Sequence, residues 1–381
     1  MMTSSSSVCV IGVGYVGEHL VDVFSKVHNV IGYDVSPYRV ELMQKYFADK
    51  PNVTIQSTLD GLDNCDLFCI SVPTLLNAEK NGIDTSYIES AAKTIDKVAK
   101  KGSIVVIESS VAVGMTRTIM GHFRKERDLY IGFSPERVDP GRTDPPADKI
   151  PKIISGMDNE SLEKIKEFYE SVFDHVVPVS SMETAEMCKL YENCFRMINV
   201  AYVNEIADNC GSHGIDVYEM VRACSTKPFG FMPFYPGLGV GGHCIPVNPF
   251  YLFTNNKLPL LKSATDVTLK RPEEKANQIE EENVLVVGLA FKPGESYTMN
   301  SPGLDIANAL VTNGKNVTVY DPLVDPETKP VKHHKFLDNE DWNSEYIINN
   351  FDAVVVAIKQ RDIDFTVLGK VTCKVYKYCE L

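Results

Sequence analysis

The sequence has no long hydrophobic run: no segment approaches the roughly 20 apolar residues that a membrane-spanning helix requires. Its ten cysteines include no C-x-x-C pair, and the start MMTSSSSVCV lacks the basic region that opens an export signal. Lysine and arginine total 38 against 51 aspartates and glutamates, a net charge of −13. These absences argue against a membrane protein and against a general affinity for nucleic acid or anionic membranes, and they predict reduced thiols in the cytoplasm.

What is present is the composition of an ordinary globular protein, 44% hydrophobic and 23% charged, over 381 residues. This length predicts two or three domains, with a cleft between domains as the expected place for a ligand.

A glycine-rich turn follows the first predicted strand. After apolar residues 8–11 come Gly12-Val13-Gly14-Tyr15-Val16-Gly17, an amphipathic helix, and a second strand that ends at Asp34. Asp34 lies 20 residues after Gly14, the offset expected in a dinucleotide-binding fold. The glycines let a pyrophosphate approach the helix N-terminus, and the Asp34 carboxylate can accept hydrogen bonds from ribose hydroxyls but would repel a 2′-phosphate. The motif therefore predicts a site for NAD rather than NADP.

Strands and helices continue to alternate after this motif. Strands are predicted over 65–72, 103–110 and 129–135, and helices near 85–100, 115–126 and 160–172. This alternation predicts an α/β fold with a doubly wound parallel sheet, in which ligands bind beyond the carboxyl ends of the strands. The residues at those ends are Pro73, Thr74, Ser109, Ser110, Ser134, Pro135 and Glu136. Glu136 is a candidate pocket carboxylate, and a solvated acid at a strand end is the equally open alternative.

A long helix is predicted over 182–209, where apolar residues recur at helical spacing without proline or glycine. At 1.5 Å per residue it would be about 40 Å long, enough to join two domains. Lys189 and Asn193 lie four residues apart and share one face, where they could donate to a developing oxyanion. Spacing alone favours an ordinary polar stripe.

One cysteine has an unusual setting in segment 236–252, PGLGVGGHCIPVNPFYL. Glycines at 237, 239, 241 and 242 precede Cys244, and Pro246 and Pro249 stiffen the exit from the turn. Cys244 is either a nucleophile presented to a carbonyl or a buried structural cysteine beside a turn. Taken alone, the segment favours the structural interpretation.

A second strand–helix–strand unit follows a predicted helix and linker at 270–283. It comprises strand 283–287, a helix near 302–312 and a strand that ends at Asp321, and a strand at 353–358 extends the sheet. The residues from Gly288 to Lys292 are not a dinucleotide motif. We therefore expect a second Rossmann-like domain for a different phosphate ligand, with Lys292 as its counter-charge.

Four segments together make the chain resemble the UDP-glucose/GDP-mannose dehydrogenase family over nearly its whole length: GVGYVG (12–17), SPERVDPG (134–141), TKPFGFMPFYPG (226–237) and GGHCIPV (241–247). They look most like the UDP-N-acetylhexosamine 6-dehydrogenase branch. The resemblance implies two Rossmann-like domains joined by the long helix. They would be an NAD-binding domain at 1–181, a central helical region with the cysteine and a dimer contact at 182–265, and a UDP-sugar-binding domain at 266–381. It also implies a homodimer that oxidises the C6 alcohol of a UDP-sugar to a carboxylate with two NAD per turnover.

The resemblance further implies roles for single residues. Cys244 would attack the C6 aldehyde to give a thiohemiacetal and then a thioester, Lys189 and Asn193 would hold the oxyanion, and Glu136 would assist hydrolysis. The cofactor would contact Gly12, Val13, Gly14, Tyr15, Val16, Gly17, Asp34, Arg39, Val72, Pro73, Thr74, Ser109 and Ser110. The substrate would contact Glu136, Arg137, Lys189, Asn193, Tyr235, Gly237, Gly241, Phe291 and Lys292. No metal site is predicted.

The chain departs from the family pattern at several positions. Asn248 stands where the family usually has an aspartate, four residues after the cysteine, and we retain it as a catalytic position. Met299 replaces an arginine expected to meet cofactor phosphate, and the stretch from Leu252 to Val284 is shorter than expected. These departures leave two alternatives open: a UDP-glucose 6-dehydrogenase, or a catalytically impaired homologue that binds NAD and UDP-sugar.

Overall fold

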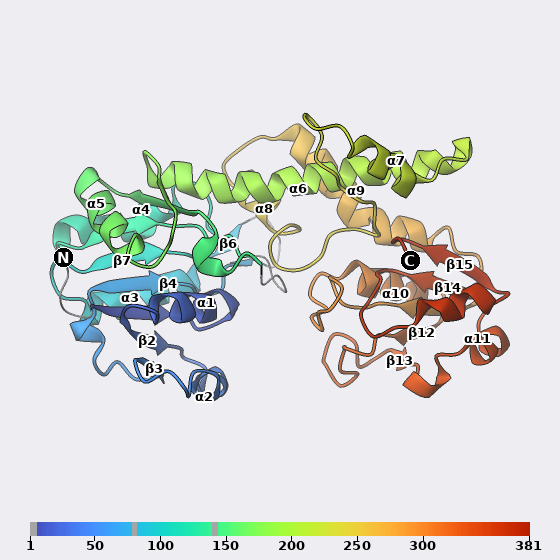
Figure 1. The fold of residues 1–381 in the computed structure, drawn as a ribbon, viewed down its shortest axis with the longest axis horizontal. Coiled ribbons are helices and arrows are strands. Elements are labelled where there is room, and N and C mark those ends of the chain that lie inside the picture. The colour runs from blue at the N-terminus through green and yellow to red at the C-terminus, as the bar shows by residue number, and fades with distance from the viewer. Residues whose placement is uncertain (1–5, 78–81, 139–143) are drawn as a thin grey trace. The chain divides into compact units, whose positions relative to one another are not determined.

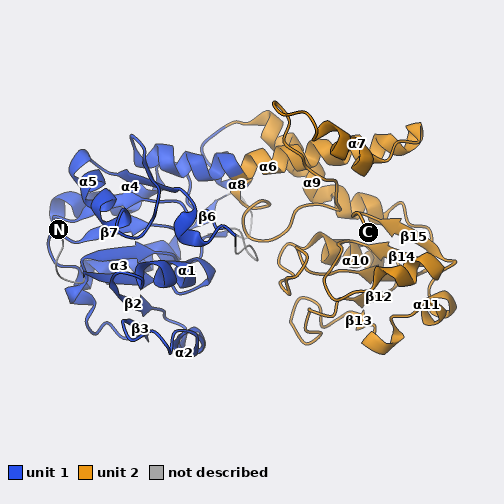
Figure 2. Ribbon diagram, viewed as in Figure 1, with its two compact units in different colours: residues 1–192, 250–256 blue, residues 193–249, 257–381 orange. Residues whose placement is uncertain are grey.

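The computed structural model describes residues 6–77, 82–138 and 144–381 (Figure 1). Residues 139–141 of the segment SPERVDPG and residues 1–5 of the N-terminal start therefore lie outside the described residues. The chain divides into two compact units, which Figure 2 colours separately. Unit 1 comprises residues 1–192 and 250–256, and unit 2 comprises residues 193–249 and 257–381.

Unit 1 is built on an eight-stranded sheet in the order β10-β9-β8-β7-β4-β1-β2-β3. Its strands are β1 (Ser7–Ile11), β2 (Asn29–Tyr33), β3 (Val53–Gln56), β4 (Leu67–Ile70), β7 (Ile104–Ile107), β8 (Tyr130–Phe133), β9 (Lys152–Gly156) and β10 (Val176–Pro178). A separate two-stranded pair is formed by β5 (Leu75–Leu76) and β6 (Ile83–Asp84). The predicted parallel arrangement is confirmed from β3 to β8, where every neighbouring pair is parallel.

The prediction is wrong at one junction, because β9 pairs antiparallel with β8 through Gly132–Gly156 and Phe133–Ser155. A parallel pair needs a long crossover connection, usually a helix. In the described part of this connection, 134–138 and 144–151, the one helical turn is η2 (Ala147–Lys149). The chain therefore returns along the sheet edge in the opposite direction.

Helices α1 (Tyr15–Phe24), α2 (Pro37–Tyr46), α3 (Ser86–Val98), α4 (Met115–Glu126) and α5 (Asn159–Tyr169) complete unit 1. Side chains along β1 alternate between two separate cores. Val8 and Val10 pack in a cluster with α1, α2 and α5, whereas Cys9 and Ile11 pack in a cluster with α3 and α4. The strand is apolar from Val8 to Ile11 and is thus buried on both faces, as a doubly wound sheet requires.

Unit 2 contains a five-stranded sheet in the order β13-β12-β11-β14-β15, with every pair parallel. Its strands are β11 (Asn283–Val287), β12 (Asn316–Tyr320), β13 (Lys335–Phe336), β14 (Ala353–Val356) and β15 (Lys374–Lys377), accompanied by α10 (Pro302–Thr312) and α11 (Ser344–Asn350). Val284 and Val286 face one core, and Leu285 and Val287 face the other. This confirms the predicted second Rossmann-like sheet.

The segment between the two sheets is helical. The long helix predicted at 182–209 is confirmed as α6 (Met182–Cys210), followed by α7 (Val217–Cys224), α8 (Asn248–Phe253) and α9 (Pro259–Ala276). One boundary predicted here is wrong. The helix expected within the helix and linker at 270–283 is α9, which begins earlier, at Pro259, and ends at Ala276. Pro259 occupies the first helical turn, where its missing N–H costs nothing. The turn expected after Cys244 is present at 245–247, directly before α8.

Within the described ranges, no helix combines the length and the apolar character needed to cross a membrane.

Candidate active site

The glycine turn between β1 and α1 has the geometry that close packing demands. Gly12 has φ +88°, and a Cβ on Gly17 would lie 1.9 Å from the Gly12 carbonyl oxygen, so α1 can approach β1 only if residue 17 is glycine. A Cβ on Gly14 would meet no atom within 4 Å. Gly14 is also the N-cap of α1, and no side chain caps this end of the helix. The turn therefore leaves open backbone and uncapped N–H groups at a helix N-terminus, which suits a pyrophosphate.

Asp34 and Arg39 hold this turn from the neighbouring strand and helix. The Asp34 carboxylate accepts hydrogen bonds from Val13 N (3.0 Å) and Ser36 N (2.9 Å). Arg39 donates to Val13 O (2.5 Å) and pairs with Glu18 (2.8 Å). Each carboxylate oxygen of Asp34 can accept a second hydrogen bond, so acceptor capacity for a ribose hydroxyl remains.

The strand-end residues predicted for the cofactor lie beside the same turn. Ser71 Oγ donates to Gly12 O (2.6 Å), and Ser109 Oγ donates to Val72 O (2.7 Å). Tyr251, from α8, donates to Thr74 O (2.8 Å). These bonds fix the ends of β4 and β7 around the turn, so the residues present fit an NAD site.

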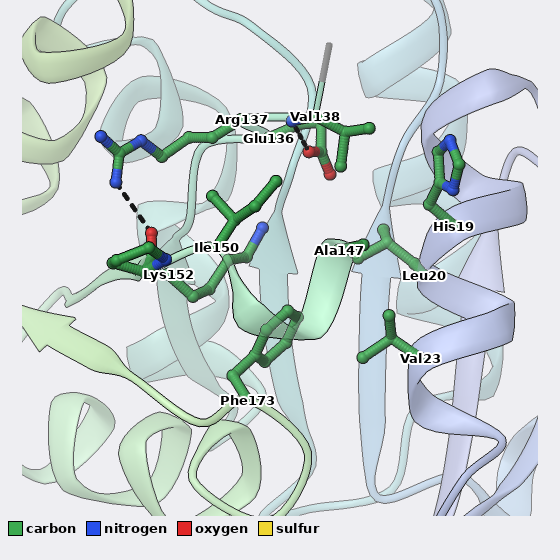
Figure 3. Close-up of a pocket in the computed structure, with 11 residues that line it drawn as sticks. His19, Leu20, Val23, Glu136, Arg137, Val138, Ala147, Ile150, Lys152 and Phe173 are labelled. Atoms are coloured by element: carbon green, nitrogen blue, oxygen red, sulfur yellow. Dashed lines mark hydrogen bonds between the residues drawn. The ribbon is translucent and has the colours of Figure 1, made fainter. Parts of the chain in front are cut away.

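The Glu136 segment follows β8 and is held by hydrogen bonds from several elements of unit 1. Lys189 Nζ donates to the Glu136 carbonyl, and one carboxylate oxygen of Glu136 accepts from Val138 N. Arg137 donates to Glu192 (2.6 Å) and to Pro151 O (2.8 Å). Figure 3 shows Glu136 and Arg137 at a pocket also lined by Lys152 and, from α1, His19. The pocket has about 10 Å³ of free space, roughly enough for one water molecule and too little for a sugar nucleotide.

The cysteine segment belongs to unit 2 together with Asn193 and Asn248. The Cys244 side chain is exposed. It is therefore not the buried cysteine that the structural interpretation predicted. Its carbonyl accepts from Val247 N (3.2 Å) and Asn248 N (2.9 Å) at the start of α8. The Asn193 amide donates to Asn248 Oδ1 (2.5 Å), and both side chains are buried. Asn248 therefore holds the predicted oxyanion donor Asn193 in place.

The loop that precedes α10 packs directly against the cysteine segment. Gly242 N donates to Met299 O (3.0 Å), and the Asn300 side chain donates to Gly242 O (2.9 Å). A Cβ on Gly241 would lie 2.6 Å from the Cβ of Phe291. The predicted substrate residues Gly241 and Phe291 are therefore adjacent. Lys292 follows Phe291 in the same loop and is half-buried.

The neighbouring segment at Tyr235 and Gly237 is fixed by α6 and α9. Gly237 N donates to Asn204 (2.8 Å), and Arg271 donates to Gly237 O (3.0 Å), while the Tyr235 side chain is exposed. Arg271 and Lys275 both bind the Asp208 carboxylate. Partial burial works to raise the pKa of Asp208, but these two cations outweigh it and hold the pKa below its ordinary value.

Sequence reasoning missed the residues that support the predicted ones, namely Glu18, Ser71, Glu108, Lys152, Tyr251 and Asn300. Ser71 and Glu108 each lie one residue beyond a buried strand, which is a usable signal for a pocket. Lys152, Tyr251 and Asn300 carried no such signal, because their partners lie far away in the sequence.

Comparison with known proteins agrees with this geometry. The chain is 31% identical over 359 residues to a UDP-N-acetyl-D-mannosamine dehydrogenase of Campylobacter jejuni, covering 85% of this chain and 88% of the relative. It is 30% identical over 386 residues to a UDP-N-acetyl-D-glucosamine 6-dehydrogenase of Salmonella typhi, covering 92% and 89%. Its structure matches a UDP-D-ManNAc dehydrogenase from Pyrococcus horikoshii with a TM-score of 0.83 and 25% identity, over 98% of this chain and 95% of that one.

Three domain models match in order along the chain. Residues 6–173 match the NAD-binding domain of one family, residues 183–267 its central domain, and residues 285–376 its UDP-binding domain. With these matches and the relatives above, the chain belongs to the UDP-glucose/GDP-mannose dehydrogenase family.

Proposed function

We propose that this NAD-dependent nucleotide-sugar dehydrogenase oxidises C6 of a UDP-N-acetylhexosamine to the uronate through a covalent intermediate on Cys244. The observation that carries the proposal is the exposed Cys244 in GGHCIPV, in a chain that is about 30% identical to UDP-N-acetylhexosamine dehydrogenases over most of its length.

The glycine turn, Asp34 and the strand ends at Val72–Thr74 and Ser109–Ser110 would hold NAD. NAD, when bound, accepts the electrons that leave C6 in each of the two oxidations. Gly12, Gly14 and Gly17 admit the pyrophosphate to the start of α1, and Asp34 accepts from the ribose.

Cys244 has the chemical task of retaining the half-oxidised sugar. Its sulfur forms a bond to the C6 aldehyde carbon, giving a thiohemiacetal whose oxidation leaves a thioester. Lys189 and Asn193 stabilise the oxygen that carries negative charge in these steps. In the final step a water oxygen bonds to C6, Glu136 accepts the water proton, and the C–S bond breaks to release Cys244 as a thiolate.

The stoichiometry tests the proposal. One UDP-sugar, two NAD⁺ and one water should give one uronate, two NADH and three protons. A panel of UDP-GlcNAc, UDP-ManNAc, UDP-glucose and GDP-mannose should show the highest kcat/KM for an N-acetylhexosamine. Cys244→Ala should form no uronate, whereas Cys224→Ser, which changes the other exposed cysteine, should keep full activity. Equal loss in both variants would contradict a nucleophilic role for Cys244.

Two alternatives remain as outcomes of the same panel. The highest kcat/KM for UDP-glucose would make the chain a UDP-glucose 6-dehydrogenase. The second alternative is a catalytically impaired homologue, which Asn248 favours because an amide cannot accept a proton as a carboxylate can. Binding of NAD and UDP-sugar without NADH formation would establish it.

Asn248→Asp separates an impaired site from a rebuilt one. The introduced carboxylate could still accept a hydrogen bond from the Asn193 amide, and it would restore the group usual in the family. Turnover should therefore rise several-fold if the reaction can still use a carboxylate at this position. Unchanged or lower turnover would mean that the site functions with the amide.

We also infer a homodimer formed through α6. Met187, Tyr191, Phe195 and Tyr202 lie on one face of this helix and are all exposed, with Tyr191 at 67% and Tyr202 at 65%. Light scattering should give twice the mass of one chain. The double variant Tyr191→Asp with Tyr202→Asp should reduce the measured mass to that of a single chain. Tyr38→Asp, at an exposed tyrosine on α2, is the matched control.

We also propose that the boundaries between the three functional domains lie near residues 181 and 265, and that the protein is cytoplasmic. The ten cysteines, all within the described ranges, are free, which suits a reducing compartment.

A further inference from the structure

A buried ion pair lies behind the Glu136 segment in unit 1. Glu108 directly follows β7 and is 1% exposed, and Lys152 opens β9 and is 4% exposed. Lys152 Nζ lies 2.5 Å from Glu108 Oε2, and the Tyr169 hydroxyl donates to Glu108 Oε1 at 2.6 Å. Both carboxylate oxygens therefore have a partner, and the mechanism above uses none of these three residues.

The pair extends to the backbone on either side of Glu136. Lys152 Nζ also donates to Pro135 O at 3.2 Å, and Lys189 Nζ donates to Glu136 O. The two carbonyls that flank the Glu136 Cα are thus each held by an ammonium group. Arg137 adds a third connection by donating to the carbonyl oxygen of Pro151, the residue before Lys152.

Stability alone is a weak reason for this arrangement. A buried ion pair contributes little net stability, because desolvation of both charges offsets their attraction. Burial raises the pKa of the Glu108 carboxyl, whereas burial of the Lys152 ammonium is outweighed by the nearby carboxylates, which raise its pKa, so the cost of burial falls on the carboxylate. What the network does supply is geometry: every member has a directed partner, so the position of residues 135–136 is tightly defined.

We propose that Glu108, Lys152 and Tyr169 are positioning residues that fix the Glu136 carboxylate for hydrolysis of the Cys244 thioester. This inference rests on the proposed function. In that step the Glu136 carboxylate takes the proton of a water whose oxygen bonds to C6 as the C–S bond breaks, and a carboxylate displaced by about 1 Å can lower such a rate by about 100-fold. In the proposed mechanism Glu136 accepts a proton only in this last step, so loss of its position should slow hydrolysis more than the steps that form the thioester.

The test is to separate thioester formation from hydrolysis in Lys152→Met, which removes both hydrogen bonds of the ammonium. Rapid mixing with NAD and UDP-sugar should give a burst of two NADH per site, followed by a steady state slowed by one to two orders of magnitude. Intact mass spectrometry should find the uronyl adduct on Cys244. Tyr169→Phe, which removes the bond to Glu108 and the 3.8 Å contact with Cys69 Sγ but leaves Lys152 unchanged, should slow the steady state by about fivefold.

Matched variants control for a general loss of structure. Lys152→Arg keeps the charge and the donors and should restore most of the steady-state rate. Lys149 lies three residues before Lys152 and forms an exposed ion pair with Asp174. Lys149→Met removes this pair and should leave both the burst and the steady state unchanged. If Lys152→Met does not fold, Glu108→Gln with Lys152→Gln removes both charges together and takes its place. Equal slowing of burst and steady state, or no accumulated adduct, would overturn the positioning role.

A second readout does not depend on turnover. Val138 N donates to the Glu136 carboxylate, so its amide exchange reports where that carboxylate lies. Exchange at Val138 should accelerate in Lys152→Met and not in Lys149→Met, and unchanged exchange would overturn the proposal. If the wild-type protein forms no NADH with any nucleotide sugar, the proposed function fails, while this measurement still decides whether the network positions Glu136.

Discussion

The two sheets of this chain begin alike and differ in the connection that leads from the first glycine to the next helix. In unit 1, β1 is joined to α1 by residues 12–14, whereas in unit 2 the connection from β11 to α10 takes residues 288–301. Gly12 and Gly288 have φ +88° and +85°, and in both units a glycine in the next helix lies against that first glycine's carbonyl. The same strand–helix packing therefore supports a tight turn in one unit and a long loop in the other.

The aspartates that end the second strands also differ. Asp34 is half-buried and bound by two backbone N–H groups. Asp321 is buried and binds Leu289 N, Ala290 N and the Gln360 side chain. One carboxylate retains access for a ligand, and the other is committed to the loop that follows β11. The common fold thus sets where a ligand can lie, while the connection after the glycine decides which groups it contacts.

Substitution of the packed glycines should have the largest effect. In Gly17→Ala and Gly303→Ala the new Cβ would lie 1.9 Å and 2.2 Å from a backbone oxygen. Each should destabilise its own unit by about 3 kcal/mol or more, measured by denaturant unfolding with hydrogen exchange assigned to each unit. Gly14→Ala, where a Cβ meets nothing, should weaken NAD binding with little loss of stability. If Gly17→Ala is as stable as wild type, close packing does not require glycine at this position.

Substitution of the two aspartates should separate binding from stability. Asp34→Asn should weaken NAD binding by about tenfold, since a charged acceptor for the ribose is lost, with little change in unfolding. Asp321→Asn should cost about 2 kcal/mol, with NAD affinity unchanged, because its one oxygen can still accept from Leu289 N and Ala290 N but its NH2 group would face the buried Gln360 amide donor. Titration calorimetry and urea unfolding measure the two quantities, and the reverse pattern would contradict the division of roles between the two aspartates.

A smaller effect is expected in the long loop. Asn300 has φ +48° and donates to Gly242 O, which a carboxylate cannot do. Asn300→Asp should raise the KM for the UDP-sugar by about fivefold, the value of one hydrogen bond, and leave NAD affinity unchanged. Asn300→Gly, which suits the backbone but also removes the bond, should behave similarly; an unaltered KM in both would exclude this contact from substrate binding.

The smallest expected effect is an opposite response of the two units to acid. In unit 1, Glu186 is buried and accepts from Gly114 N and Thr116 N, and its burial raises its pKa above 4.5. Its favourable contribution to folding is therefore present below pH 4.5 and lost as the pH rises through the raised pKa. In unit 2, Asp208 has a lowered pKa, so its contribution is present above pH 3.8 and lost as the pH falls below that value.

Acidification from neutral pH toward 4.5 should thus stabilise unit 1 relative to Glu186→Gln, and further acidification should remove the stability that unit 2 has relative to Asp208→Asn. Amide exchange measured for each unit across this range tests the signs. Glu186→Gln should flatten the response of unit 1, and Asp208→Asn that of unit 2. A difference between wild type and variant that has the same sign in both units would refute the assignment.

Much of this fold could be predicted from the sequence because its signals are local. Continuous apolar runs such as those of β1 and β4, followed by glycine or serine, identify buried parallel strands, and apolar spacing at 182–209 identifies α6. The direction of β9 could not be predicted, since a strand has the same apolar pattern whichever way its neighbour runs.

The candidate site divides in the same way. Asp34 and Cys244 stand beside glycine motifs that the sequence displays, and the exposure of Cys244 contradicts the burial that the structural interpretation of its segment required. The contacts of Lys152 with Glu108 and of Asn300 with Gly242 join residues 44 and 58 apart, and neither residue type nor spacing predicts such pairings.

The short segment 250–256 completes unit 1 although residues 193–249 precede it. Within it, the buried Tyr251 donates to Thr74 O, and Asn255 donates to Val113 O. On the ribosome, the first sheet therefore cannot obtain these contacts until residue 256 has been translated and has left the exit tunnel. A nascent chain that stalls after α6 would lack the hydrogen bonds to Thr74 and Val113, so translation well beyond the first sheet is needed to complete unit 1.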